Sequence, residues 1–541
     1  FVAPLNTALG MRFDLVCVVG MVEGAMPPRQ PDDPLLPDRE RQRAGGPSAG
    51  LPLRGGREAD ERYSYLAALA AGERCVLSFP QGNPGSQRGQ FPSRWFLEAA
   101  TQLHGAPVYT SDLRAIGPVP WLTTVASMED GLRTVATESA ADIHDRDVEG
   151  LWRWRRAGMP MEQHHLAASG QLSRALNLEQ GREARQLTHW DGDVSILKGR
   201  TRRLRLLDRP ALSPTSLETW ATCPFRYLMS NVLGVAALEQ PEDVATMSPL
   251  EKGSLVHGVL ESFIRGGQKE RSLPTPEEPW SEEHRNRLRH LALESFADAE
   301  ERGVTGKALL WELQQEAILS DLDEFLSADA GLRERFGVTP HLVEVRFGLP
   351  GSSGGEPGLE AAQRDIPGVG ILRFRGVADR VDLDPSGKLA LVLDYKTGST
   401  RSYRSMKDDP VAGGKRLQLP IYTIALQNSL GTDVTVRAAY WFVSASGRFE
   451  IIPPEPVEMA EVAKRFDSVV GTIAQGIAEG LFPANPGTED RNGFSNCNYC
   501  DFNTLCPSRR DIHWERKQAD SRLQAYLQMQ SGEADKAEGE C

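Results

Sequence analysis

The sequence lacks the signals that would place a protein in a membrane or export it. It contains no apolar run of about eighteen residues, the length that a membrane span requires. It also lacks the basic start and the short apolar centre of a secretory signal. We therefore expect no membrane span and a cytoplasmic protein. The chain begins at Phe1, and its first residues already lead into a strand, so we expect a piece of a longer polypeptide.

A nucleotide-binding loop and an excess of positive charge are also missing. No G-x4-G-K-[S/T] phosphate loop occurs in the 541 residues, so we expect no ATP hydrolysis by this chain alone. The formal net charge of −13 excludes a histone-like coating of nucleic acid, which needs concentrated positive charge. The acidic net charge does not exclude a basic channel within the protein. Residues 197–209 are rich in arginine and form either one wall of such a channel or an exposed linker. Acid gathers in residues 531–541, which we expect to be a disordered tail.

The composition is that of an ordinary globular protein, with 40% apolar and 25% charged residues, and the length allows three or four domains. Residues 1–105 alternate strand-like and helical runs, which is typical of an α/β unit with a parallel sheet. Residues 106–210 carry weak signals and are interpreted as a helical connector. Residues 211–510 predict a second α/β domain, with a mixed sheet flanked by helices. Residues 511–541 are expected to form a C-terminal helix and the acidic tail.

The second α/β domain opens with a helix signal. Ser213 followed by Pro214 predicts a helix start, and Thr215 with Glu218 forms a second possible capping box. Further strands are expected near residues 341–350 and 436–445, with helices from about 417 and over 460–480.

Residues 371–399 read as two strands joined by a Pro-Ser-Gly turn at 385–387. Because side chains alternate along a strand, Asp394 and Lys396 point to the same side, and the turn can bring Asp379 alongside Asp394. Two carboxylates suit Mg²⁺ or Mn²⁺, and the lysine can orient or deprotonate an attacking water. This chemistry fits phosphodiester hydrolysis. The alternative is an incidental Asp/Lys ion pair on a surface hairpin.

Three observations favour the catalytic interpretation. Lysine is scarce, with 11 against 50 arginines, and an arginine in place of Lys396 could not act as a base. His257 and Glu261 lie one helical turn apart above an apolar stripe. Gln418 and Tyr422 follow the hairpin with a spacing of one helical turn, so both can face the same cleft.

In combination these motifs resemble the RecB-type branch of the PD-(D/E)XK nuclease superfamily, over residues 212–510. That branch has a histidine in the first helix, an Asp in the second strand, an Asp-x-Lys in the third strand and a Gln-x3-Tyr helix. The metal ligands that the resemblance implies are His257, Asp379, Asp394 and the carbonyl of Tyr395. The catalytic residues that it implies are Asp379, Asp394, Lys396, Gln418 and Tyr422. Glu344 occupies a place where relatives often carry an acid.

The seven cysteines divide into two groups. "CNYCDFNTLCP" gives a Cys-x2-Cys pair and a third cysteine, and "TCPF" supplies a candidate fourth ligand. The four candidate ligands are Cys223, Cys497, Cys500 and Cys506. From spacing alone zinc and an iron–sulfur cluster both stay open, although two of these cysteines precede proline, as in some iron–sulfur ligand runs. Cys17 and Cys75 lie in apolar strand runs and are expected in the core.

One cysteine before and three after a nuclease domain is similar to the iron staple of AddB-type subunits. That resemblance favours a [4Fe-4S] cluster that pins the two ends of the domain together, with a structural role. Residues 1–105 resemble the last part of the second motor domain of UvrD-like helicases. The motor is degenerate, because "LAALAAGERC" stands where an active motor has a Thr-Arg-Ala run and only Arg62 matches its first arginine.

A degenerate motor followed by an iron–sulfur nuclease domain is the layout of AddB- and AdnA-type subunits of bacterial helicase–nucleases. The resemblance implies a metal-dependent DNA exonuclease that acts in double-strand break repair by recombination. An AddA- or AdnB-type partner would feed it single strands unwound from duplex ends and supply its ATP dependence.

Two other functions stay open. One is a standalone iron–sulfur nuclease, as in CRISPR spacer acquisition, which the helicase-like front end disfavours. The other is a catalytically silent DNA-binding scaffold, which the intact Asp379, Asp394 and Lys396 disfavour.

Overall fold

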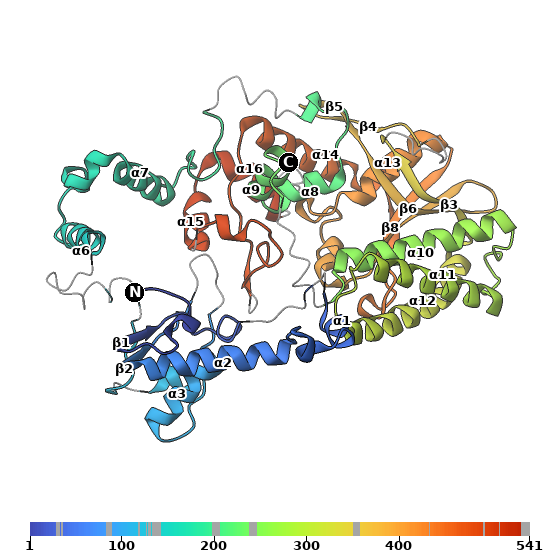
Figure 1. Cartoon of the computed structure of the whole chain (residues 1–541). Coiled ribbons are helices and arrows are strands. Elements are labelled where there is room, and N and C mark those ends of the chain that lie inside the picture. Colours follow the sequence, from blue (N-terminus) through green and yellow to red (C-terminus); the bar gives the residue numbers. More distant parts are fainter. Residues whose placement is uncertain are drawn as a thin grey trace. The chain divides into compact units, whose positions relative to one another are not determined.

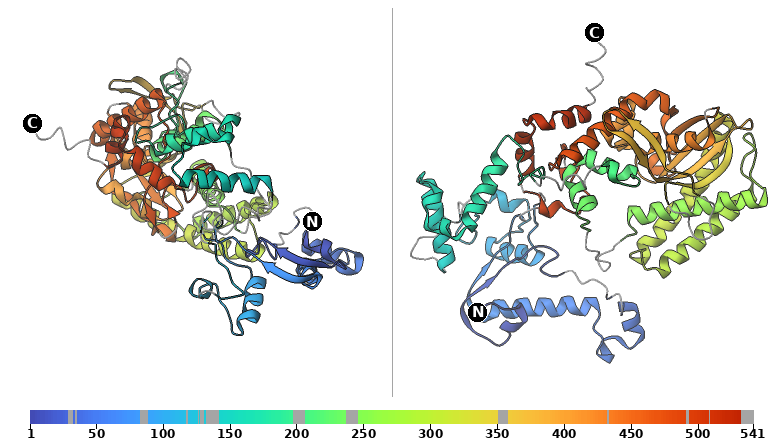
Figure 2. Two further views of the ribbon diagram at one scale, coloured as in Figure 1. Left: turned by 90° about the vertical axis from the view of Figure 1, so that its left-hand side faces the viewer. Right: turned by 90° about the horizontal axis from the view of Figure 1, so that it is seen from above.

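The computed structural model describes all residues except 29–32, 34–35, 83–88, 117–118, 126, 128–130, 132–141, 197–205, 237–245, 350–357, 432, 491–492, 508 and 532–541. Most of the arginine-rich segment 197–209 and nearly all of the acidic tail therefore lie outside the described residues. The chain divides into two compact units (Figure 1, Figure 2). The first unit comprises residues 1–181 and 503–508, and the second comprises 182–502 and 509–541. The boundary at residue 181 falls inside the segment 106–210 that we interpreted as a connector.

The first unit contains the parallel sheet that the sequence predicts. Strands β1 (Phe13–Val18) and β2 (Gly72–Leu77) pair in parallel, and helix α2 (Arg54–Ala71) leads directly into β2. Its small core contains Val18, Met21, Tyr65, Trp95, Phe96, Ala100, Val108 and Leu113. Its other helices are η1 (Leu5–Ala8), α1 (Asp38–Arg43), η2 (Gly46–Ala49), α3 (Arg94–His104), α4 (Asp112–Ala115), α6 (Ile143–Arg156), η4 (Met161–Gln163), η5 (His165–Ser169), η13 (Asn503–Leu505) and most of α7 (Gln171–Glu183). The resemblance of this unit to a helicase motor stays a prediction.

The expectation that Cys17 and Cys75 lie in the core is wrong, because both are exposed. Their apolar neighbours Leu15 and Val76 are also about half exposed, at 47% and 51%. The described part of the first unit covers this two-stranded sheet incompletely, so Leu15 and Val76 stay about half exposed although Val18 is buried.

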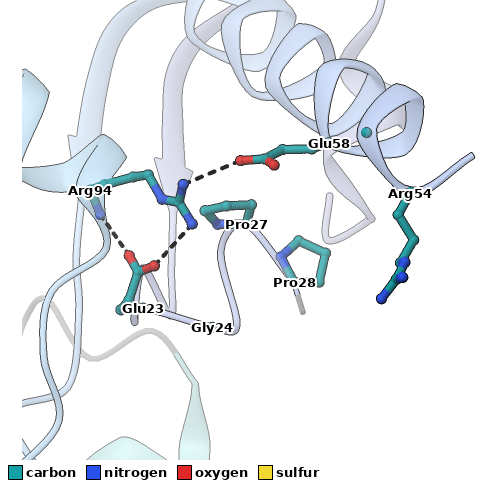
Figure 3. A pocket seen from close by; sticks show the side chains of 8 residues that line it. Glu23, Gly24, Pro27, Pro28, Arg54, Glu58 and Arg94 are labelled. Carbon is teal, nitrogen blue, oxygen red and sulfur yellow. Dashed lines mark hydrogen bonds and ion pairs between the residues drawn. The ribbon is translucent and has the colours of Figure 1, made fainter. Parts of the chain in front are cut away.

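A surface pocket of about 490 Å³ lies beside the start of α2 in the first unit (Figure 3). The Arg94 guanidinium projects into it and pairs with Glu23 at 3.1 Å and with Glu58 at 3.3 Å. Arg54, the first residue of α2, pairs with Asp38 at 3.1 Å. Both guanidinium groups that line this pocket are therefore neutralised by carboxylates.

The second unit is built on a mixed five-stranded sheet with the order β3-β6-β7-β8-β9. The strands are β3 (Thr339–Phe347), β6 (Gly376–Leu383), β7 (Leu389–Lys396), β8 (Thr435–Phe442) and β9 (Ile451–Glu458). β7 and β8 are parallel, with helix α13 (Gln418–Leu430) between them in sequence, and the other pairs are antiparallel. The mixed sheet predicted from the sequence is confirmed.

Helices cover both faces of this sheet, as Figure 1 shows. In β7 the side chains of Ala390 and Val392 face one core, while Leu391 and Leu393 face the other. The first core includes α8 (Pro214–Thr222), α13, α14 (Met459–Glu479) and α16 (Gln524–Ser531). The second core includes α10 (Pro249–Glu270), α11 (Glu282–Glu301) and α12 (Ala308–Phe336). A strand buried on both faces has a continuous apolar sequence, which explains the run "LALVL".

The expected first strand of the hairpin is divided in two. β5 (Gly370–Phe374) pairs with β4 (Ala362–Ile366) in a separate antiparallel hairpin, and β6 begins only at Gly376. Arg375, between β5 and β6, donates its N–H to the carbonyl of Leu212, and the Leu212 N–H donates to Arg373. Leu212, which precedes α8, therefore occupies backbone groups of Arg373 and Arg375. In a continuous first strand these groups would have been free to pair within the main sheet.

The remaining short elements of the second unit are η7 (Leu206–Asp208), α9 (Pro224–Tyr227), the π-helical turn η8 (Leu228–Val232), η10 (Thr400–Lys407), η11 (Ala412–Gly414), η12 (Ala445–Gly447), β10 (Glu489–Asp490), β11 (Gly493–Phe494), α15 (Arg510–Lys517) and η14 (Ser521–Leu523). Among all the described helices, none combines the length and the apolar character needed to cross a membrane.

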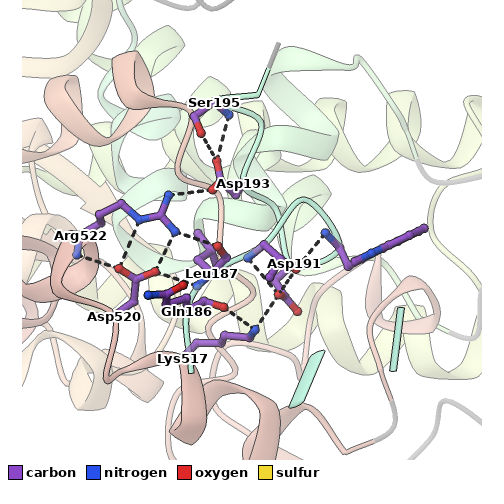
Figure 4. Close-up of polar contacts among 10 residues, drawn as sticks. Gln186, Leu187, Asp191, Asp193, Ser195, Lys517, Asp520 and Arg522 are labelled. Atoms are coloured by element: carbon purple, nitrogen blue, oxygen red, sulfur yellow. Dashed lines mark hydrogen bonds and ion pairs between the residues drawn. The ribbon is translucent and has the colours of Figure 1, made fainter. Parts of the chain in front are cut away.

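A buried ionic network joins the first and last segments of the second unit, and we call it the polar clasp (Figure 4). Arg522 pairs with Asp193 and with Asp520, at 2.7 and 2.8 Å, and Asp520 accepts the N–H of Leu187 at 2.7 Å. Lys517 adds a second contact, 2.7 Å from Asp191. Although burial acts to raise it, the hydrogen bonds from Arg522 and Leu187 lower the pKa of Asp520 to about 2. The clasp therefore requires an ionised Asp520.

Candidate active site

The structure brings the two aspartates and the lysine of the hairpin together. β6 and β7 pair antiparallel with Arg380 opposite Leu393, which puts Asp379 beside Asp394. The main-chain N–H of Tyr395 donates to Asp379 Oδ2 at 2.6 Å. The side chain of Asp394 is nearly buried and forms an ion pair with Lys396.

Three possible metal ligands converge next to this pair. The ligand atoms of His257, Glu344 and Asp379 all lie within 4.8 Å of one another, and no other such group of three occurs in the described part of the chain. His257 Nδ1 lies 3.3 Å from Asp379 Oδ1. The three residues come from α10, β3 and β6, so the site forms where one helix crosses two neighbouring strands.

The electrostatics of this group favour a cation. Burial, together with the charges of Asp379 and Glu261, raises the pKa of Glu344 to about 7. Burial also raises the pKa of Asp394, against the opposing charge of Lys396. Glu344 has a φ of 50°, which is strained for a residue other than glycine and is frequent at functional sites. Crowded carboxylates of this kind share protons until a positive ion binds between them.

The residues fit a divalent metal ion. Two carboxylates and an imidazole are suitable donors for such an ion. The nearly buried carboxylate of Asp394 lies beside Asp379. The ion pair with Lys396 compensates only part of the cost of burying this charge, because the pKa of Asp394 is still raised by burial. Asp394 is therefore a candidate further ligand, and the carbonyl of Tyr395 stays a predicted one.

Gln418 and Tyr422 lie at the same site, as their spacing predicted. Lys396 Nζ donates to Gln418 Oε1 at 3.1 Å, and Gln418 Nε2 is 3.4 Å from the hydroxyl of Tyr422. Although burial acts to lower it, the charge of Asp394 raises the pKa of Lys396 above its ordinary value. The lysine is therefore held as an ammonium ion, which favours an electrostatic role over the role of a base.

Sequence reasoning missed two neighbours of Lys396. The ring of Tyr440 in β8 lies 5.2 Å from Lys396 Nζ. Glu218 does not form the expected capping box with Thr215: Ser213 caps α8, and the Glu218 carboxylate accepts the N–H of Leu417 instead. The one signal in the sequence is that Glu218 is an acid among the apolar residues of α8, which could have indicated a role other than capping.

Three of the four candidate cluster ligands approach one another. Cys223 ends α8, and burial together with the charges of Cys500 and Cys497 raises its pKa to about 11. Such a buried thiol stays protonated unless a metal ion replaces the proton, so the donor set fits a thiolate-bound metal. The three sulfur atoms do not all lie within 4.8 Å of one another. Cys506 belongs to the first unit, so its part in this site stays a prediction.

The sheet, the acidic group at its edge and the adjacent lysine are those of a nuclease fold. The family model of the PD-(D/E)XK nuclease superfamily matches residues 211–507, and the chain belongs to this superfamily. The resemblance named from the sequence is confirmed.

The chain is also similar to curated proteins whose names describe the B-type subunit of an ATP-dependent helicase/deoxyribonuclease. The protein from Lacticaseibacillus paracasei is 24% identical over 435 residues, which are 76% of this chain and 33% of that protein. The protein from Moorella thermoacetica is 26% identical over 429 residues, covering 75% and 33%. The protein from Symbiobacterium thermophilum is 26% identical over 440 residues, covering 77% and 34%. The chain spans about a third of the length of the curated relatives it matches.

Proposed function

We propose that this chain carries the nuclease domain of the B-type subunit of a helicase–nuclease. It hydrolyses phosphodiester bonds of single-stranded DNA as an exonuclease, with Mg²⁺ or Mn²⁺ bound by His257, Asp379 and Asp394, and with Glu344 beside them. The observation that carries the proposal is the convergence of these groups next to Lys396 at one edge of the sheet.

Each residue has a defined part in the chemistry. When bound, the divalent ion would offset the negative charge of the phosphate and polarise it. Lys396 presents an ammonium group that stabilises the charge developing on the phosphoryl oxygens. Gln418 and Asp394 hold this ammonium group from two sides, and Tyr422 in turn contacts Gln418.

The proposal extends to a cluster and to a partner. Cys223 and Cys506 each precede proline, as in some iron–sulfur ligand runs, which supports a [4Fe-4S] cluster over zinc. Its role is to tie α8 to the segment around Cys500. The names of the relatives support an AddA- or AdnB-type helicase partner. In the cytoplasm this ATP-driven partner would supply single strands from broken duplex ends for repair by recombination.

A nuclease assay tests the central claim. End-labelled single-stranded DNA is incubated with the 541-residue chain, with Asp394→Ala or with Asp365→Ala, in Mg²⁺ or in EDTA. Asp365 is an exposed acid in the β4–β5 hairpin and serves as the matched control. We expect Asp394→Ala to lose about 10²- to 10³-fold in rate, and Asp365→Ala to cut like the wild type. Equal cleavage by the wild type and Asp394→Ala would reject the site, whereas absence of cleavage by the wild type would favour the DNA-binding scaffold.

A further inference from the structure

Glu218 makes an unusual connection between two helices of the second unit. Its Oε1 accepts the main-chain N–H of Leu417 at 2.6 Å, across 199 residues of sequence. Leu417 is the residue immediately before α13 and is completely buried. The carboxylate of one helix thus reaches the first turn of the other.

The start of α13 has no acceptor of its own. Leu417 has no side chain that could cap the helix, and the first turn contains no acidic residue. The N-terminal N–H groups of a helix lack intrahelical partners and carry a partial positive charge, so a nearby carboxylate stabilises them. Glu218 supplies the missing hydrogen-bond acceptor from α8.

The first turn of α13 is also part of the cleavage site. Gln418, the next residue, accepts a hydrogen bond from Lys396 Nζ at 3.1 Å. Lys396 lies between Gln418, Asp394 and the ring of Tyr440, so a shift of this turn would move the ammonium group. A displacement of about 1 Å can cost about 10²-fold in rate.

The setting of Glu218 argues against an incidental acid. Burial raises the pKa of its carboxyl group, and the opposing influences are the Leu417 N–H and the charges of Arg416 and Lys396. Glu218 is partly buried, and a carboxylate withdrawn from water is costly unless it is hydrogen-bonded or paired. The neighbours Leu217, Trp220 and Ala221 on α8 are packed into the core.

We propose that Glu218 is a positioning residue of the cleavage site. Its carboxylate fixes the start of α13 through the Leu417 N–H and thereby holds Gln418 against Lys396. This inference rests on the proposed nuclease function, and it adds a residue that does not itself touch the substrate or the metal.

Three variants of the 541-residue chain test this role. Glu218→Gln keeps an oxygen at the same distance, Glu218→Asp withdraws the acceptor by about one carbon–carbon bond, and Glu218→Ala removes it. We expect Glu218→Asp and Glu218→Ala to lower kcat about ten- to a hundredfold, the range of one hydrogen bond to a charged group. KM for single-stranded DNA and the half-saturating Mg²⁺ concentration should stay within about twofold, and Glu218→Gln should retain most of kcat.

The matched control is Asp467→Asn. Asp467 pairs with Arg364 at 2.6 Å and joins α14 to β4 away from Lys396, so it should reduce thermal stability without changing kcat. A wild-type kcat in Glu218→Asp would overturn the positioning role. A Glu218→Gln variant that loses as much kcat as Glu218→Asp, or that does not fold, would also overturn it, because the amide oxygen offers the same acceptor. Absence of Mg²⁺-dependent cutting by the wild type would instead refute the proposed function.

Discussion

Replacing Asp520 by asparagine removes one charge from the polar clasp while keeping the size of the side chain. The ordinary pKa of 3.8 falls to about 2 in the folded chain, which corresponds to about 2 kcal/mol of folding free energy at neutral pH. The Asp520 side chain is only 4% exposed, whereas that of Arg522 is 38% exposed, so solvent screens part of this contribution. We therefore expect Asp520→Asn to be less stable than the wild type by up to about 2 kcal/mol at pH 7.

The pH dependence identifies the source of this loss. Because the pKa of Asp520 is lowered in the folded state, its contribution is complete well above pH 4 and disappears as the pH falls from about 4 towards 2. The gap between wild type and Asp520→Asn should thus be constant between pH 7 and 5 and shrink at pH 3. Urea unfolding followed by tryptophan fluorescence measures the gap, because the ring of Trp220 packs against Tyr526 of α16.

A surface ion pair serves as the control. Asp323 pairs with Arg285 but is 66% exposed, so Asp323→Asn should change the unfolding free energy by less than about 1 kcal/mol at either pH. If Asp520→Asn matches the wild type at pH 7, or if its deficit is as large at pH 3 as at pH 7, the charge of Asp520 does not hold the clasp together.

Three further predictions concern the site and the cysteines. Lys396→Met should lower kcat about 10²- to 10³-fold without weakening Mg²⁺ binding, because the ammonium group is not a ligand; wild-type cleavage would contradict this. Cys500→Ala should give a colourless, protease-sensitive protein, and a brown, folded variant would contradict the iron–sulfur assignment. Replacing the exposed Arg401, Arg404 and Lys407 of η10 by alanine should lower by about 2 the slope of log affinity for single-stranded DNA against log salt. An unchanged slope would show that η10 does not bind the single strand. A matched control replaces three exposed cations in or next to α10 and α11, Lys269, Arg271 and Arg289.

The sequence predicts those parts of the fold that depend on local pattern. The hairpin that places Asp379 beside Asp394 follows from strand alternation and a tight turn, and β6 and β7 pair as expected. The spacing of Gln418 and Tyr422 likewise puts both side chains on one side of α13. The parallel pairing of β1 with β2 follows from the alternation of strand and helix.

The sequence does not predict features that depend on distant parts of the chain. The break after β5 depends on Leu212, which hydrogen-bonds to Arg373 and Arg375 on either side of Phe374, and local propensity does not predict that contact. Thr215 and Glu218 do not form a capping box because α8 begins at Pro214 with Ser213 as its cap, and Glu218 instead accepts the N–H of the distant Leu417. The positive φ of Glu344 could not be predicted either, because the sequence around it is that of an ordinary strand.

The polar clasp also sets an order of events during synthesis. Asp193 and Arg522 are 329 residues apart, so a ribosome that adds about 5 to 20 residues per second makes them roughly 15 to 65 s apart. Until Arg522 has been made, the carboxylate of Asp193 has no guanidinium of Arg522 to bind, even after β9, the last strand of the main sheet, ends at Glu458. The polar clasp therefore forms only after Arg522 in η14 has been made, later than every strand of the main sheet.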